Sequence, residues 1–430
     1  MIEMKDSGIE WIGDIPAHWD VKRIKDIAYL GSGTTPKSSN EKYYDGTHPW
    51  LITGDVQNRL IEQNENFITD LALADIPNLK LYPAKTVLLA MYGGGTIGNV
   101  GLMTYPAYIN QACCAMIPKS GIYEKYLFYY LRTKYSRIIS TGVGGTQINL
   151  SQNKIAAYPI AVPPFKEQQT IADYLDTKTA EIDKQINALE KKSDAYQRLK
   201  RSLISEVVTR GLNPTAELKD SGIEWIGEIP EHWVIKRFKE MFRHYSTGFT
   251  PDSKDMNYFA DDEINTWVTI ADLVDKYIVD SNMYLSDKAI NDYAPILSPK
   301  GSLLFSFKLS VGKTAFAGKN LYTNEAIVTI PPQRNNDLRY FYYLIPEACA
   351  NNATENIYGA KMLNQKIIAN MILFAPPIDE QRAISDYLDK KTAEIDSNIS
   401  AISSKIDAYK RLKQSLIDEV VLGKRRIEKA

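Results

Sequence analysis

Cysteine and histidine are scarce in this sequence of 430 residues, and neither occurs in a metal-binding spacing. The three cysteines (Cys113, Cys114 and Cys349) form no C-x-x-C motif, and the four histidines do not cluster. We therefore expect no disulfide framework and no zinc site, and we expect a reducing, cytoplasmic environment. We interpret the cysteines as small buried residues.

Long hydrophobic runs are also missing. Apolar stretches such as residues 87–92 are far shorter than a membrane-spanning helix, and the first eight residues are polar and acidic. We therefore predict no membrane association and no secretion signal. The net charge is −1, so general attraction to nucleic acid is not indicated. A chain of this kind that binds DNA must concentrate its basic residues locally or rely on a partner for them.

The sequence contains two copies of one pattern. Residues 5–15 read KDSGIEWIGDI, and KDSGIEWIGEI follows 214 residues later at 219–229; proline, a variable residue, histidine and tryptophan come next in both copies. Near the end of each half, DAYQRLKRSLISEVV at 194–208 matches DAYKRLKQSLIDEVV at 407–421. The segments between these matches diverge. Two copies of this length indicate two homologous domains and not a solenoid of short repeats.

Each half ends in the pattern of a long coiled-coil helix. A Pro-Pro pair and a Glu-Gln pair come first, and proline suits the first turn of a helix. Apolar residues then recur every seven positions, which is typical of a coiled coil. These residues are Leu175, Ile182, Leu189, Tyr196 and Leu203 in the first copy, and Leu388, Ile395, Ile402, Tyr409 and Leu416 in the second. We predict that the helices pair with each other; the alternative is that each apolar stripe packs on its own domain.

The diverged interiors are predicted to be mainly β. Residues 86–90 and 302–306 are short apolar runs that follow turn residues, and glycine clusters follow the first run. Short helices around 124–131 and 338–344 are expected to close each sheet. The predicted fold class is α+β, with two mainly β domains and two long helices in an intramolecular antiparallel coiled coil, related by a pseudo-two-fold axis. The first domain is predicted to span residues 1–165 and the first long helix 166–212. The second domain is predicted to span 213–378 and the second long helix 379–430.

Three near-matches to enzyme motifs are incomplete. The glycines from Gly93 to Gly98 have dinucleotide-binding spacing, but no helix pattern follows them. The Gly-Lys-Thr at 312–314 resembles the end of a phosphate loop, but Phe307 stands where that loop needs its first glycine. The Pro-Pro pairs follow Val162 and Ala375, whereas amino-methyltransferases have Asp, Asn or Ser there. We therefore predict no catalytic residue, no metal site and no bound cofactor.

The repeated EWIG openings, the paired domains and the Glu-Gln-led heptad helices resemble the specificity subunits of type I restriction-modification systems over nearly the whole chain. The resemblance implies two target-recognition domains, each reading one half of an asymmetric, bipartite site in double-stranded DNA. It implies helices that set the spacer between the half-sites and dock two methyltransferase subunits. Those partners would methylate adenine N6 with S-adenosylmethionine, and ATP-dependent restriction subunits would complete the complex. Two alternatives remain: a coiled-coil tether with two protein-binding domains, and a self-sufficient DNA methyltransferase.

Polar residues in expected loops are the candidates for DNA contact, because exposed hydrogen-bonding groups read bases and basic side chains bind phosphates. In the first half they are Thr34, Lys37, Ser38, Gln57, Asn58, Arg59, Tyr92, Thr96, Asn99, Thr146, Gln147 and Asn149. In the second half they are Thr250, Lys254, Lys308, Ser310, Lys313, Lys361 and Asn364. The alternative for each is an ordinary solvated loop residue. We expect Gln147→Ala to change the preference at one half-site, and Lys37→Ala to weaken binding to all sequences alike.

Overall fold

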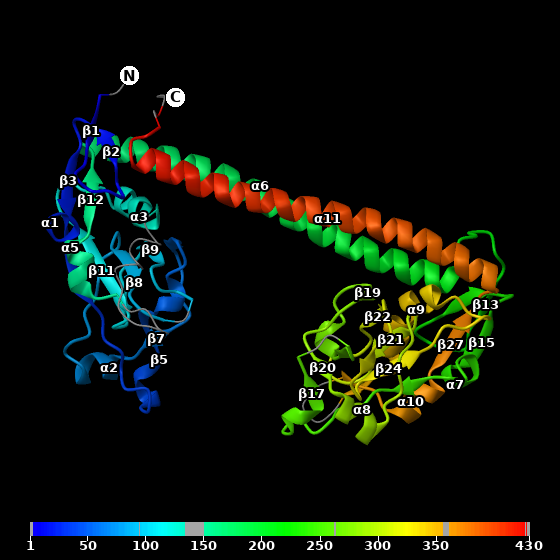
Figure 1. Cartoon of the computed structure of the whole chain (residues 1–430). Coiled ribbons are helices and arrows are strands. Elements are labelled where there is room, and N and C mark those ends of the chain that lie inside the picture. Colours follow the sequence, from blue (N-terminus) through cyan, green and yellow to red (C-terminus); the bar gives the residue numbers. More distant parts are fainter. Residues whose placement is uncertain are drawn as a thin grey trace. The chain divides into compact units, whose positions relative to one another are not determined.

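The computed structural model of the chain describes residues 3–93, 95–133, 150–261, 264–355, 361–425 and 427. Its residues form two compact units, Met1–Glu190 with Ser403–Ala430, and Lys191–Ile402. Each unit contains parts of two long helices, α6 (Phe165–Arg210) and α11 (Ile378–Val421). We call the remainder of the first unit the first head and the remainder of the second unit the second head (Figure 1).

The first head is built around a mixed five-stranded sheet. Its described strands are β1 Met4–Asp6, β2 Asp14–Pro16, β3 Asp20–Arg23, β4 Ala28–Ser32, β5 Tyr44–Leu51, β6 Arg59–Ile61, β7 Phe67–Ile68, β8 Val87–Ala90, β9 Val100–Met103, β10 Tyr108–Ile109, β11 Cys113–Pro118 and β12 Pro159–Val162. Its described helices are α1 Ile24–Ile27, α2 Asp70–Asp75, α3 Glu124–Thr133 and α5 Gln152–Ala157, with 3-10 turns at Glu41–Tyr43 and Thr53–Asp55. The main sheet has the order β4-β11-β8-β9-β6, and smaller sheets β10-β5-β7, β12-β3 and β1-β2 accompany it.

The second head repeats this sheet. Its described strands are β13 Leu218–Asp220, β14 Glu228–Pro230, β15 Val234–Arg237, β16 Ser246–Thr247, β17 Phe259–Ala260, β18 Trp267–Val268, β19 Tyr277–Ile278, β20 Tyr284–Leu285, β21 Leu303–Ser306, β22 Thr314–Ala317, β23 Tyr322–Thr323, β24 Ile327–Ile330, β25 Thr354–Glu355, β26 Lys361–Met362 and β27 Ile372–Ala375. Its helices are α7 Phe238–Met241, α8 Asp287–Tyr293, α9 Leu338–Asn352 and α10 Gln365–Asn370, with 3-10 turns at Met256–Tyr258 and Ile270–Asp272. The main sheet has the order β16-β24-β21-β22-β19, and strand pairs β17-β20, β18-β23, β15-β27, β13-β14 and β25-β26 complete the head.

The two main sheets have the same pairing directions. In each, the outermost pair on one side (β9 with β6, or β22 with β19) is parallel and the other neighbours are antiparallel. The registers also agree, because Leu60 pairs with Leu102 in the first head as Tyr277 pairs with Phe316 in the second. The predicted homology of the two interiors is therefore visible as one sheet built twice.

Both faces of each central strand are buried, which explains why the sequence there is apolar without alternation. Along β8, Val87 and Leu89 pack into one apolar cluster, and Leu88 and Ala90 into another on the opposite face. The predicted strands at 86–90 and 302–306 are confirmed as β8 and β21. The glycine-rich segment after β8 leads to β9, the antiparallel neighbour of β8.

The helices that follow the sheets are longer than expected. The first prediction, 124–131, corresponds to α3, which ends at Thr133. The second, 338–344, corresponds to α9, which continues through Pro346 to Asn352. Ile345, Ala348 and Cys349 are fully buried on that extension, and this packing compensates for the backbone hydrogen bond that proline removes.

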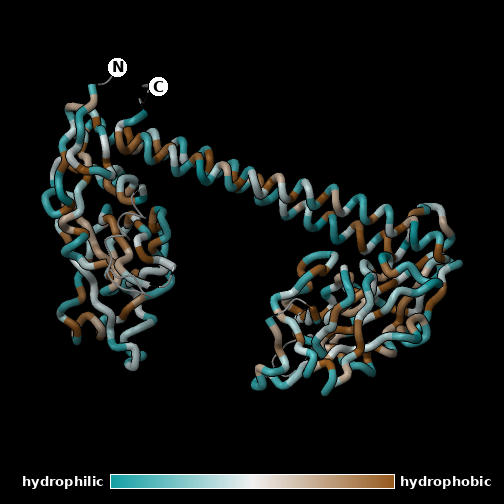
Figure 2. The backbone as a smooth tube through the Cα atoms, in the orientation of Figure 1, coloured by the Kyte–Doolittle hydropathy of each residue, from teal (hydrophilic) through white to brown (hydrophobic). Residues whose placement is uncertain are grey.

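The long helices begin directly after the Pro-Pro pairs, as predicted. In the first unit, Ile182 and Ile186 of α6 share an apolar cluster with Leu416 and Val420 of α11. In the second unit, the last turns of α6 and the first turns of α11 share another cluster. The beginning of each helix thus meets the end of the other, which is the predicted antiparallel pairing, and hydrophobic residues recur along both (Figure 2).

The end of α6 has the left-handed backbone that glycine favours. Gly211 has φ +73° and donates its N–H to the carbonyl of Val207, so it terminates the helix. Among the described residues, no helix is apolar over enough of its length to cross a membrane.

Candidate functional site

The exposed candidates of the first head lie in two loops. Lys37 and Ser38 are exposed between β4 and β5, and Gln57 and Arg59 are exposed at the start of β6. The Gln57 amide donates to the carbonyl of Gly54 at 2.7 Å, so this side chain is partly engaged within its own turn. Lys37, Ser38 and Arg59 remain the most available of the four for an outside ligand.

Other candidates of the first head brace the fold. Asn58 has φ +56°, its amide donates to Asn99 Oδ1 at 3.0 Å, and its own Oδ1 accepts the backbone N–H of Val100. Thr34 donates its hydroxyl to the carbonyl of Asn78, and Tyr92 donates to that of Gln111. The structure thus brings Asn58 and Asn99 together, at the base of the β8–β9 hairpin.

That hairpin also contains Thr96. Its hydroxyl is buried and has no hydrogen-bond partner among the described residues, so it retains its capacity to donate or accept. The candidates Thr146, Gln147 and Asn149 lie outside the described residues.

In the second head, the corresponding hairpin joins β21 to β22. Lys313 and Ser310 are exposed, and Lys308 lies half-exposed with its ammonium 5.6 Å from the Phe307 ring centroid. Leu309, at the tip, is 80% exposed and has φ +60°. Sequence reasoning did not single out Leu309, because nothing in the sequence marks an apolar residue as a hairpin tip.

The remaining candidates of the second head are scattered. The hydroxyl of Thr250 donates to Glu325, and Lys254 is exposed nearby in the chain. Asn364 accepts the N–H of Ile367 at 2.8 Å, so it caps α10. Lys361 lies in β26, and only its backbone is described.

A second group of polar residues joins each head to the long helices, and sequence reasoning missed its role. Gln168 is fully buried; it accepts the N–H of Tyr123 at 2.8 Å and donates to the carbonyls of Pro163 and Gly121. Gln381 makes the same link in the second unit, accepting from Asp337 and donating to Pro376. The repeated Glu-Gln pair therefore fixes the first turn of each helix on its head.

The glutamates of these pairs hold the histidines of the repeated openings. His18 Nε2 lies 2.8 Å from Glu167 Oε2, and His232 Nε2 lies 2.7 Å from Glu380 Oε2. Glu380 also accepts the indole N–H of Trp233 at 3.1 Å. These two histidines therefore join the opening segment of each head to its long helix.

Each head is also attached to the end of the long helix that does not directly follow it. A tyrosine of α3 attaches the first head to α11, and a tyrosine of α9 attaches the second head to α6. Tyr126 donates its hydroxyl to the carbonyl of Ala161 at 2.8 Å and lies 3.3 Å from that of Val421, at the end of α11. Tyr340, 214 residues later, donates to the carbonyl of Val208 at 2.9 Å, near the end of α6. Burial raises the pKa of both phenols well above its usual value, so they remain neutral donors.

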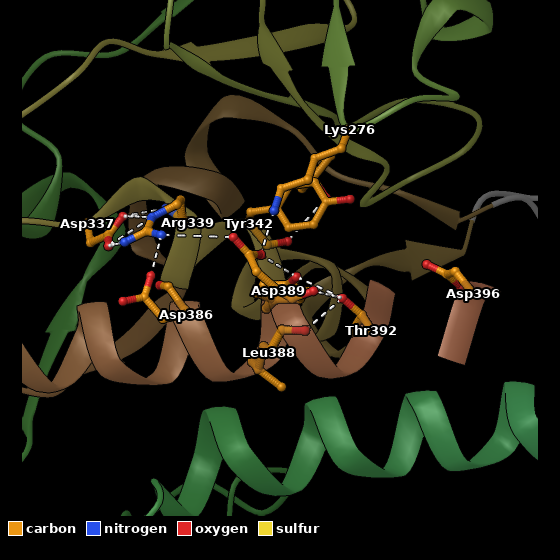
Figure 3. Close-up of polar contacts among 12 residues, drawn as sticks. Lys276, Asp337, Arg339, Tyr342, Asp386, Leu388, Asp389, Thr392 and Asp396 are labelled. Carbon is orange, nitrogen blue, oxygen red and sulfur yellow. Dashed lines mark hydrogen bonds and ion pairs between the residues drawn. The ribbon is translucent and has the colours of Figure 1, made fainter. Parts of the chain in front are cut away.

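A further tyrosine of each head donates a hydrogen bond to an aspartate of a long helix. Tyr129 donates to Asp176 at 2.7 Å, and Tyr343 donates to Asp389 at 2.6 Å. Burial is the main cause that raises the pKa of both tyrosines, and the hydrogen bond to the carboxylate adds to it. Figure 3 shows Asp389 facing the second head from α11, with Lys276 reaching toward it.

The heptad residues form the seam of the helix pair. Leu175, Ile182, Leu388, Ile395, Ile402 and Leu416 are buried, and Leu189, Tyr196, Leu203 and Tyr409 are half-buried. One ion pair is repeated beside the seam: Lys413 with Asp183 at 2.6 Å in the first unit, and Lys200 with Asp396 at 2.7 Å in the second. The predicted coiled coil is confirmed.

Both halves of the chain match one family model, the type I restriction modification DNA specificity domain, at residues 16–191 and 230–407. The chain belongs to this specificity family. The type I restriction enzyme MjaIX specificity subunit of Methanocaldococcus jannaschii is 27% identical over 97% of this chain and 96% of its own length. The EcoKI specificity subunit of Escherichia coli K12 is 20% identical over 96% of this chain and 90% of its own.

Solved structures share the fold of this specificity-family chain. A chain from a structure on complex assembly and conformational transition of the type I R-M system has a TM-score of 0.73 at 16% identity, covering 95% of this chain and 98% of its own length. The HsdS subunit of Thermoanaerobacter tengcongensis has a TM-score of 0.53 at 16% identity, covering 96% and 98%. The family and the α+β class predicted from the sequence are both confirmed.

One apolar feature of this specificity-family fold is repeated on its helices. Leu199 of α6 is 53% exposed and Leu412 of α11, 213 residues later, is 51% exposed. Both leucines lie outside the seam in segments of nearly identical sequence. The two copies therefore expose the same large apolar side chain at the same place in the helix sequence.

Proposed function

We propose that the chain is the DNA-reading subunit of a type I restriction-modification complex. Its first head, within residues 1–165, reads one half of a bipartite site in double-stranded DNA, and its second head, within 213–378, reads the other half. The helices, within 166–212 and 379–430, set the length of the unread spacer and dock two methyltransferase subunits. ATP-dependent restriction subunits complete the complex, in the cytoplasm.

This proposal rests on one observation: the two heads contain the same five-stranded sheet, but the equivalent hairpins of the two sheets present different side chains. The β8–β9 hairpin contains Gly93, Gly95 and Thr96, whereas the β21–β22 hairpin contains Lys308, Leu309 and Lys313. Sequence readout depends on the donors and acceptors that such segments present to base edges. Because the two sets differ, the two half-sites should differ, and the full target should be asymmetric.

Docking of the methyltransferase subunits is proposed at the repeated helix surfaces. Leu199 and Leu412 supply an apolar contact at equivalent places, and exposed charges surround them on each helix. A surface that occurs twice suits two copies of one partner, in agreement with the predicted two methyltransferase subunits.

We propose that this chain itself is not catalytic. Val162 and Ala375, which precede the Pro-Pro pairs, are buried at the ends of β12 and β27 and have no side-chain acceptor for a target amine. Among the described residues, no three His, Cys, Asp or Glu side chains gather as a metal site. Methyl transfer from S-adenosylmethionine is assigned to the partner subunits.

The test is to express the chain with its methyltransferase subunits and to map the modified adenines in host DNA by methylation-sensitive sequencing. We expect one asymmetric motif of two short parts separated by an unread spacer. Host DNA carrying the methyltransferase subunits without this chain is the control and should lack that motif. A palindromic motif, or modification that is unchanged without this chain, would contradict the proposal.

A further inference from the structure

A crevice of 860 Å³ lies in the second unit between the head and the helix pair. Residues from β19, α9 and both long helices line it, including Lys200, Tyr277, Tyr342, Asp389 and Asp396. Strands of the main sheet and both long helices face this space. A side chain that spans the crevice links the edge of the sheet to the helix pair directly.

Lys276, which directly precedes β19, is such a side chain. Its ammonium lies 2.5 Å from Asp389 Oδ1 on α11, the same oxygen that accepts the Tyr343 hydroxyl at 2.6 Å. Both members of the ion pair are largely shielded, with side-chain exposures of 27% and 28%. Shielding from water strengthens an ion pair compared with one at the open surface. Figure 3 shows Lys276 descending from the sheet toward Asp389.

Aromatic rings flank the ammonium of Lys276. Its ammonium lies 5.2 Å from the Tyr342 ring centroid and 5.6 Å from that of Tyr343. Tyr277, the next residue, stacks on Phe316 at 5.5 Å, and Phe316 stacks on Tyr342 at 5.5 Å. The edge of the sheet, helix α9 and helix α11 are thus joined at one point.

The first unit lacks this link from its sheet. The strand pairing places Arg59 of β6 where Lys276 stands in the second unit, and the side chain of Arg59 makes no ion pair with any described residue. Instead the ammonium of Lys125, on α3, donates to Asp176 Oδ2 at 2.5 Å. The guanidinium of Arg132, also on α3, lies 5.2 Å from the Phe128 ring centroid. There the cations come from the adjoining helix α3, and no ion pair between β6 and a long helix is found in the part of the first unit that the structure describes.

We propose that Lys276 is a positioning residue that fixes the main sheet of the second head on its helices, and thereby fixes the spacing at which the second half-site is read. The inference rests on the proposed function, since it assigns a specificity role within the reading of a bipartite site. It makes the two heads mechanically unlike at this point: the cation that reaches the aspartate of the long helix comes from the edge of the main sheet in the second unit and from α3 in the first.

The test uses the full chain with its methyltransferase subunits and DNA duplexes in which the spacer is native, or one or two base pairs longer or shorter. Lys276→Met removes the charge and keeps the length of the side chain, and Lys276→Arg keeps the charge. Lys288→Met is the matched control, because Lys288 makes an ion pair with Asp255 at 3.2 Å and lies over the Tyr258 ring elsewhere in the second head. The measurement is the dissociation constant for each duplex, with thermal unfolding to confirm that each variant folds.

For Lys276→Met we expect the preference for the native spacer to fall about fivefold, the effect typical of one shielded ion pair, with the bases preferred in each half-site unchanged. Lys276→Arg and Lys288→Met should retain the wild-type preference. If Lys276→Met keeps the wild-type spacer profile, Lys276 has no positioning role. If Lys276→Met does not fold, Asp389→Asn replaces it, because it removes the charge and leaves an acceptor for Tyr343.

A measurement without DNA tests the positioning role of Lys276 separately from the proposed DNA-reading function. Hydrogen–deuterium exchange at Tyr277–Ile278 should be faster in Lys276→Met than in the wild type, and Lys288→Met should leave exchange at Tyr277–Ile278 unchanged. Wild-type complex that binds no DNA would refute the proposed function while this exchange still decides whether Lys276 holds the sheet. Unchanged exchange in Lys276→Met would refute the inference even if the complex binds its target well.

Discussion

Gln168 and Gln381 are buried amides whose hydrogen bonds all lead from the first turn of a long helix to its head. Burying a polar group is unfavourable unless its partners are supplied, and both glutamines meet that condition. One partner of each glutamine is the carbonyl of a proline five positions earlier, and another is a backbone N–H of the head, 45 positions from Gln168 or 44 from Gln381.

Replacing Gln168 with alanine should lower the free energy of unfolding by about 2 kcal/mol, because the N–H of Tyr123 and two carbonyls would lose their partner in a buried place. Gln381→Ala should lower the free energy of unfolding by a similar amount. Urea unfolding followed by circular dichroism measures the change. Gln185→Ala, at an exposed position on α6, is the control; equal losses in Gln185→Ala and Gln168→Ala would contradict the assignment.

Lys37 is exposed in the loop before β5, and its proposed role is to hold a phosphate. Lys37→Ala should weaken binding to specific and nonspecific duplexes by the same factor and reduce the salt slope of binding by about 1. Fluorescence anisotropy over a range of salt concentrations measures both, with Lys191→Ala on α6 as the control. A change confined to one base sequence would instead indicate base reading.

The buried thiols should make the free energy of unfolding depend on pH in the alkaline range. Burial raises the pKa of Cys114 and Cys349 to about 12, against 9.0 for an unburied thiol. Because the folded pKa is the higher one, this contribution is intact below pH 9 and is lost as the pH rises toward 12. We expect the free energy of unfolding to fall by about 1.4 kcal/mol per pH unit for each thiol between these limits. Cys349→Ala should show a shallower slope in urea unfolding at pH 9 to 11; an unchanged slope would exclude its thiol as a cause.

At the scale of elements, the long helices were predictable because a seven-residue apolar period is a local property of the sequence. The five-stranded sheets were predictable only in part: the runs that became β8 and β21 are apolar and short, but their pairing order depends on contacts across the head. Asn58 illustrates the limit for the candidate site, because its left-handed backbone and its bond to Asn99 depend on a residue 41 positions away. Likewise, nothing local links Lys276 to Asp389, 113 positions later.

The exposed leucines give an element-scale prediction for partner docking. Leu199→Asp together with Leu412→Asp should abolish co-purification with the methyltransferase subunits, because a charge replaces the apolar contact on each helix. Thermal unfolding of the chain should change little, since both side chains lie outside the seam. Gln197→Asp with Lys410→Asp, at other exposed positions of the same helices, is the control. Normal co-purification of the leucine variant would place the docking surface elsewhere.

At the scale of the whole molecule, the helix pair is proposed to act as the spacer gauge. Ile402 is 6% exposed in the seam, so Ile402→Asp puts a charge where water is excluded. Duplexes with altered spacers should then bind no worse than the native one, because the separation is no longer fixed. Ser403→Asp, on the exposed side of the same turn, should keep the native preference. A sharp spacer optimum in Ile402→Asp would refute the gauge.

Tyr126 and the apolar cluster around it have a consequence for the order in which the chain can fold. The hydroxyl of Tyr126 lies near the carbonyl of Val421, and Leu416, Ile417 and Val420 belong to the same cluster as Trp19. The first unit therefore lacks part of its core until the ribosome has added residues 403–421, whereas the second unit needs only residues 191–402. During synthesis the earlier head must wait for the last helix, so a premature stop near residue 402 should harm the first head more than the second.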